Sequence, residues 1–335
     1  MPVPLRQRAK IAWYLTKQRV RGVERFPLVV ELEPLFACNL ACAGCGKIQY
    51  PAHILKQRMG VEQAVAAIEE SGAPVVSIAG GEPLIHPEIH EIAKALTDRK
   101  KFVYLCTNAL LMQKKMELFE PSTYFAWAVH IDGLRERHDE SVCEEGVFDV
   151  AVDAIKEAKR RGFRVTTNST FFSHDTPKGI RDCLDFLNDD LDVDAMMISP
   201  AYAYWKAPDQ DHFMGVEETR KLFQQVFAGG TRKKWRLNHT PLFLDFLEGK
   251  VDYECTPWGI PSYSMFGWQR PCYLQADGYA KTYKELVDTT DWSKYGRHSG
   301  NVQCRNCMAH CGYEPTAVMA TTKSLKESIR ALVNS

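Results

Sequence analysis

The feature that most constrains the fold is the repeated alternation, after Pro27, of short β-rich segments with helical segments. Such alternation is typical of successive βα units with parallel strands. Six units are visible, fewer than the eight of a complete barrel, so we expect an α/β fold with an open, partial (β/α)6 barrel. Its site should lie at the carboxyl ends of the strands. The expected strands are residues 28–33, 75–79, 102–106, 124–131, 164–171 and 195–199, and the clearest helices are 61–71, 87–97, 147–161 and 176–188.

The alternation stops near Lys234, where cysteine, tryptophan, glycine and proline become dense. This change of composition indicates a second, smaller module. We therefore divide the chain into a basic leader helix (1–26), the barrel (27–233) and a cysteine-rich domain (234–335) with a closing helix near residues 323–333.

Composition excludes several classes of function. The 42 basic and 42 acidic residues cancel, so the chain as a whole has no field that would recruit nucleic acid. Eleven cysteines in a chain of 335 residues, with no apolar signal core after Met1, fit a reducing cytoplasm better than a disulfide framework. No apolar run approaches the roughly 20 residues that span a bilayer.

The leader is locally basic, because no acidic residue precedes Glu24. At helical spacing Ile11 and Leu15 point away from its basic face. Two interpretations stay open: peripheral contact with the inner face of the membrane, or a helix packed under the barrel with a solvated charged face. The basic side chains that share one face are Arg6, Lys10, Lys17 and Arg21.

A cysteine triad follows the first expected strand directly. Cys38, Cys42 and Cys45 have C-x3-C-x2-C spacing, on a loop where a barrel places its chemistry. Three thiolates can hold three irons of a 4Fe-4S cluster and leave the fourth iron open. Zinc is the alternative, although zinc cysteines usually come in pairs with a fourth ligand.

A second motif follows the second expected strand: Gly80, Gly81, Glu82 and Pro83. The glycines allow the backbone to approach a ligand closely, and Glu82 supplies an anion for an amino group. Taken alone, the motif is better explained as a strand-ending turn.

Together the two motifs resemble the radical S-adenosylmethionine (SAM) superfamily, in which they occur in this order on a partial barrel. The resemblance implies that SAM binds the open iron and is cleaved to a 5'-deoxyadenosyl radical, with Glu82 orienting the methionine amine. The family usually has an aromatic residue before the third cysteine, where this chain has Gly44, so adenine is expected to be held differently. Further cofactor contacts, unless they are merely solvated polar residues, are expected at His130, Asp132, Asn168 and Ser169.

The cysteine-rich domain is similar to the twitch and SPASM modules that hold auxiliary clusters in this superfamily. Its pattern is shortened, so we expect one auxiliary 4Fe-4S cluster bound by four of five cysteines, with a structural zinc site as the alternative. The five are Cys255, Cys272, Cys304, Cys307 and Cys311.

Residues 36–47, residues 198–204 and the cysteine-rich tail carry a further resemblance, which extends over nearly the whole chain. In these stretches the sequence resembles the adenosylhopane synthase family of hopanoid biosynthesis. That resemblance implies addition of the 5'-deoxyadenosyl radical to the terminal alkene of diploptene, a membrane triterpene, with electrons from a flavodoxin- or ferredoxin-type donor. Cys106 ends the third strand and is expected to donate the final hydrogen atom, unless it is an ordinary buried cysteine. The alternative is a twitch-type enzyme that abstracts hydrogen from a peptide or small molecule.

Overall fold

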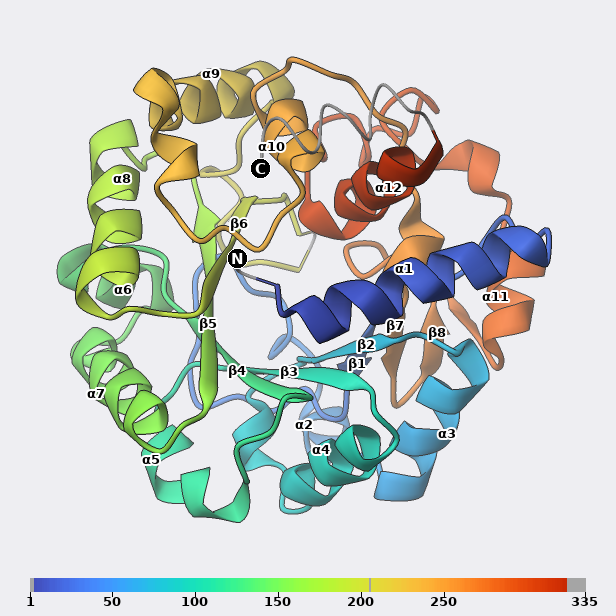
Figure 1. The fold of residues 1–335 in the computed structure, drawn as a ribbon, viewed down its shortest axis with the longest axis horizontal. Helices are drawn as coiled ribbons and strands as arrows, with labels where there is room; N and C mark the ends of the chain where they lie inside the picture. Colours follow the sequence, from blue (N-terminus) through green and yellow to red (C-terminus); the bar gives the residue numbers. More distant parts are fainter. Residues whose placement is uncertain (1–2, 205, 324–335) are drawn as a thin grey trace.

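Six parallel strands form the centre of the computed structural model, which describes residues 3–204 and 206–323. Each strand pairs with the next, and the sheet curves with helices on its outer side (Figure 1). The predicted partial barrel is thus confirmed. The strands are β1 (Val29–Glu33), β2 (Val75–Ile78), β3 (Phe102–Thr107), β4 (Phe125–His130), β5 (Arg164–Phe171) and β6 (Ala195–Pro200).

The helices between these strands begin and end close to where the sequence places them. A five-residue π-helix, Phe186–Asp190, prolongs α8 and accounts for the longer helix expected there. The helices are α2 (Ala52–Leu55), α3 (Val61–Ser71), α4 (Ile89–Asp98), α5 (Met112–Lys115), α6 (Arg135–Val142), α7 (Val147–Arg160) and α8 (Pro177–Asp185).

Alternate residues of each strand face opposite sides of the sheet. Val30 and Leu105 pack in the main apolar core with Ile68 of α3. Cys106 of β3 contacts Asn168 of β5, although β4 lies between these two strands. Such a contact is possible only across the inside of the curve, so Cys106 faces the concave side of the sheet. The strands therefore present an apolar outer face to the helices and a partly polar inner face to the barrel.

The cysteine-rich domain continues the same sheet. Its strand β7 (Ser262–Ser264) pairs in parallel with β1, and β8 (Gly267–Gln269) and β9 (Tyr279–Ala280) follow in antiparallel order. The α-helices that follow β6 are α9 (Val216–Val226), α10 (Pro241–Leu247), α11 (Tyr283–Thr289) and α12 (His310–Lys323). The closing helix expected near 323–333 lies, apart from its first residue, outside the described residues.

The leader forms α1 (Leu5–Val20), which lies across the amino ends of the strands (Figure 1). Ile11 packs against the cluster that contains Phe102, and Leu15 is buried. The Tyr104 hydroxyl donates a hydrogen bond of 2.9 Å to Gln7, which is also buried. The leader is therefore packed under the barrel. Among residues 3–204 and 206–323, no helix has the length and apolarity that a membrane crossing requires.

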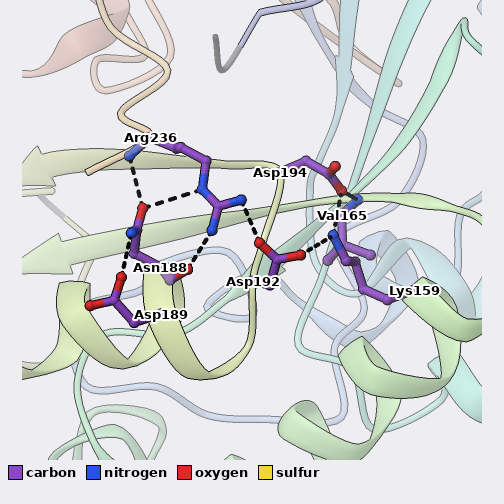
Figure 2. Close-up of polar contacts among 7 residues, drawn as sticks. All are labelled: Lys159, Val165, Asn188, Asp189, Asp192, Asp194 and Arg236. Carbon is purple, nitrogen blue, oxygen red and sulfur yellow. Dashed lines mark hydrogen bonds and ion pairs between the residues drawn. The ribbon is translucent and has the colours of Figure 1, made fainter. Parts of the chain in front are cut away.

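A polar network ties the segment entering the cysteine-rich domain to the sheet (Figure 2). Arg236 donates to Asp192 at 2.6 Å and to Asn188. Asp194 accepts from Lys159 at 3.4 Å and from the backbone of β5 at 2.8 Å. These contacts fix the turn before β6 and hold the segment around Arg236 beside it.

Candidate active site at the carboxyl ends of the strands

The cysteine triad lies on the loop that leaves the carboxyl end of β1, as predicted. Cys45 closes a turn by donating its backbone N–H to the Cys42 carbonyl at 3.1 Å. The Leu40 N–H and the Asn108 side chain approach the Cys38 sulfur at 3.4 and 3.8 Å. Weak donors to sulfur of this kind favour the thiolate, the form that ligates iron.

Burial makes these thiolates costly in the absence of a cation. It raises the pKa of Cys38 to about 11, and the pKa values of Cys42 and Cys45 are raised for the same reason. At Cys42 the neighbouring sulfurs of the triad add to the effect of burial. A bound cationic centre reverses this balance, so the donor set suits a metal cluster.

Gly80 and Gly81 bring the second motif against the triad loop. A Cβ at Gly80, whose φ is +108°, would lie 2.3 Å from the Leu35 carbonyl oxygen, and one at Gly81 would lie 2.0 Å from that of Ala37. The Gly81 N–H donates to Leu35 at 3.0 Å, and the next residue, Glu82, donates to Ala37 at 2.9 Å. The close approach expected toward a ligand is therefore made to the backbone that precedes Cys38.

Glu82 is buried, and its carboxylate holds the neighbouring loop in place. It accepts hydrogen bonds from the backbone of Leu84 and Asn108 and from the Thr107 hydroxyl, at 2.8 to 2.9 Å. Burial nevertheless raises its pKa to about 7. Because a carboxylate offers about four acceptor positions, three internal donors leave room for one more, such as a ligand amine. Pro83 begins the short turn that Glu82 caps.

His130 and Asp132 form an ion pair at the end of β4. The His130 Nε2 lies 2.9 Å from Asp132, which also accepts from the Thr170 backbone at 2.7 Å. Burial opposes the charge on His130, but Asp132 holds the pKa of His130 above its ordinary value. Asp132 also donates its N–H to the buried His138 at 3.2 Å. Only His130 of these side chains is substantially exposed, at 31%, so it is the one placed to meet a ligand.

Asn168 and Ser169 are adjacent in β5 and face opposite sides. Asn168 points into the barrel, where its amide lies 3.6 Å from the Cys106 sulfur. Ser169 is buried, and its hydroxyl donates to the Ile131 carbonyl at 2.5 Å. The structure thus brings Asn168 together with the other site residues and leaves Ser169 outside the set, because strand residues alternate.

Cys106 lies inside the barrel below these residues. Its sulfur contacts the Ser77 hydroxyl at 3.5 Å as well as Asn168. Burial raises its pKa to about 11, so it is a neutral thiol at physiological pH. Glu31, opposite Ser77 in the β1–β2 register, belongs to the same inner layer, and burial raises its pKa to about 8.

Sequence reasoning missed a buried ion pair beside the triad. Lys47 lies 2.5 Å from Glu33, and both are at most 2% exposed. The Lys47 ammonium also lies 4.1 Å from the ring centre of Tyr273, next to Cys272 in the cysteine-rich domain. No local pattern marked the pair, because Glu33 and Lys47 lie on different segments that only the fold brings together.

The tail cysteines gather around one small pocket. Burial raises the pKa of Cys272 and of Cys307 to about 12. The pocket has a free volume of about 20 Å³, the space of a single water, so a cluster would require the thiols to turn outward. Cys311 is absent from its lining, although it packs in an apolar cluster that also includes Cys272 and Cys307. The cysteines that line it are Cys255, Cys272, Cys304 and Cys307.

Neither cysteine group is arranged for a single ion. Within residues 3–204 and 206–323, no three histidine, cysteine, aspartate or glutamate side chains form a set that could hold one metal ion.

Comparison with family models divides the chain in two. Residues 32–187 match the radical SAM superfamily, and residues 196–331 match a domain of unknown function, DUF3463. The second match begins inside β6, so it overlaps the barrel as well as the cysteine-rich domain.

The two curated relatives described next are similar to less than half of the chain. A mycofactocin maturase of Mycolicibacterium smegmatis is 27% identical over 44% of this chain and 38% of its own length. An Fe-coproporphyrin III synthase of Methanosarcina barkeri is 27% identical over 38% of this chain and 33% of its own length. The chain thus matches between 33% and 38% of the length of these two relatives.

Solved structures share the fold over most of the chain. SuiB of Streptococcus suis bound to SAM superposes with a TM-score of 0.67 over 90% of this chain and 76% of its own, at 16% identity. His-tagged anSMEcpe with bound AdoMet gives 0.58 over 92% and 98%, also at 16% identity. Residues 32–187 therefore form a radical SAM core, the kind of domain for which a 4Fe-4S cluster and SAM are the characteristic cofactors, and a cysteine-containing C-terminal module follows it.

Proposed function

We propose that this chain is a radical SAM enzyme that abstracts hydrogen from a peptide or small-molecule substrate held inside the barrel, aided by an auxiliary iron-sulfur cluster in the tail. The observation that carries the proposal is the second set of four thiols around one pocket, coupled to the triad loop through Lys47 and Tyr273. A peptide or small-molecule substrate is in keeping with the names of the two relatives, a mycofactocin maturase and an Fe-coproporphyrin III synthase.

Each part of the site has a task in this proposal. When bound, the cluster and SAM supply a 5'-deoxyadenosyl radical, and a flavodoxin- or ferredoxin-type donor supplies the electron. The triad holds the cluster, while Glu82 and His130 contact the cofactor. Glu31 and Asn168 line the inner layer and offer hydrogen bonds to a polar substrate beside the radical.

The second candidate is adenosyl addition to diploptene, and Cys106 favours it. Addition to the alkene joins the adenosyl carbon to the substrate and leaves a tertiary carbon radical. A hydrogen atom from the Cys106 S–H would complete the product and leave a sulfur radical, which needs one electron and one proton to return to the thiol. The neutral, half-buried thiol inside the barrel is the chemical form that this step requires.

One assay separates the two candidates. Reduced, reconstituted protein is incubated with SAM and diploptene in D2O, and the products are analysed by mass spectrometry. Abstraction predicts 5'-deoxyadenosine without an adduct. Addition predicts adenosylhopane with one deuterium, delivered from the exchanged Cys106 thiol and lost in Cys106→Ala. Absence of any SAM cleavage by a protein with a full first cluster would contradict both candidates.

The auxiliary cluster is tested separately by metal analysis. Cys272→Ala should lose the iron and sulfide of the tail cluster, whereas Cys311→Ala should retain them, because Cys311 lies outside the pocket lining. Both variants keep the triad, which provides the internal reference for iron content. Stoichiometric zinc in the wild-type tail would instead show a structural zinc site.

A further inference from the structure

The outward face of α1 carries large apolar side chains where a surface helix normally carries polar ones. Leu5, Trp13 and Val20 are 78%, 70% and 84% exposed. At 3.6 residues per turn they fall on one stripe together with Ala9 and Ala12, which are also exposed. We call these five residues the outer stripe. It lies opposite the face that packs under the barrel.

Basic side chains border the outer stripe on both sides. Helical geometry places Arg6 and Lys17 along one border and Arg8 and Arg19 along the other, and all four residues are exposed. The helix contains no aspartate or glutamate. The surface therefore combines an apolar strip with a positive rim, although the chain as a whole carries no net charge.

We propose that the outer stripe docks the protein onto an anionic phospholipid surface. The headgroup region of a bilayer accepts apolar side chains, with tryptophan favoured there, while anionic headgroups attract the arginine and lysine rim. A second copy of this chain would bring the same positive rim and be repelled, and nucleic acid offers no medium for exposed leucine and valine. The inward face of α1 stays in the barrel, so docking needs no unfolding.

Vesicle sedimentation with the full-length protein tests this surface. Binding to vesicles of phosphatidylcholine with about 30% phosphatidylglycerol should exceed binding to phosphatidylcholine alone by at least about tenfold, and salt should weaken it. Trp13→Ser should reduce it by about tenfold, since an interfacial aromatic is lost. Lys17→Glu should reduce it and flatten the salt dependence.

Matched variants elsewhere control for general effects of polarity and charge. Val302→Ser removes a similarly exposed apolar side chain, at 72%, and Lys221→Glu reverses an exposed charge on α9. Both should bind vesicles like the wild type. Equal binding to neutral and anionic vesicles, no binding to either, or an unchanged Trp13→Ser protein would overturn the proposal. Protein with and without its iron-sulfur clusters should bind vesicles equally well. The vesicle test therefore does not depend on the reaction proposed above.

Discussion

Replacing Gly81 by alanine tests whether the second motif supports the iron-sulfur loop. The added Cβ would lie 2.0 Å from the Ala37 carbonyl oxygen and 2.6 Å from that of Phe36. Carbon and oxygen atoms in contact are separated by about 3.3 Å, so the two backbones must part by about 1.3 Å. Ala37 directly precedes Cys38, and the displacement therefore reaches the first ligand of the triad.

The expected cost follows from the contacts that this displacement breaks. The hydrogen bonds from Gly81 to Leu35 and from Glu82 to Ala37 would stretch well beyond hydrogen-bond distance, at about 1 kcal/mol each. The shifts that make room for the added methyl group cost about 1 to 3 kcal/mol more. The total, about 3 to 5 kcal/mol, is concentrated on the loop that ligates the cluster.

Iron and sulfide analysis after anaerobic reconstitution measures the consequence. Gly81→Ala should lose the iron of the first cluster, to the level of a Cys38→Ala protein, and should no longer cleave SAM. Gly60→Ala is the matched control, because a Cβ there meets nothing closer than 3.8 Å. A folded Gly81→Ala protein with wild-type iron content and SAM cleavage would refute the steric argument.

Three further predictions concern buried charges. Lys47→Met should lower the free energy of unfolding, measured in urea, by about 3 to 5 kcal/mol, because it leaves Glu33 charged and unpaired. Adding Glu33→Gln should recover most of this loss, and equal losses in the single and double variants would contradict the argument. Burial lowers the pKa of His138 to about 4, so the neutral side chain contributes about 3 kcal/mol of stability above pH 6.5, which is lost as the pH falls toward 4. The melting temperature should therefore fall less steeply from pH 7 to pH 4 in His138→Gln than in the wild type. Asp132→Asn should lower the pKa of His130, measured by NMR titration. An unchanged pKa would show that the ion pair with Asp132 is not what raises the pKa of His130.

The barrel could be predicted from the sequence because its strands and helices are long enough to show their periods. Both ends of β5 and both ends of α3 agree with expectation, and no end of the other five barrel strands differs from it by more than one residue. The strands β7 to β9, of two or three residues each, are too short to show a period. Most of α12 was also missed, since the closing helix was expected to begin only near residue 323.

The site could be predicted where its chemistry is carried by local spacing. The triad and the Gly80–Pro83 motif lie where the sequence places them, since each follows directly from the end of a strand. Contacts between distant segments could not be predicted in the same way. Nothing local distinguishes Glu33 from a solvated strand residue or pairs it with Lys47, and the inward or outward direction of Ser169 depended on the register of β5.

The pairing of β7 with β1 determines whether the two halves of the molecule could ever be separated. In a barrel cut after residue 233, β1 would become an edge strand with unpaired backbone groups, the template on which other chains add and aggregate. It is also the strand that leads into the triad loop. The tail is thus the lateral wall of the radical SAM core, and a shortened protein should be expected to aggregate before it can be assayed.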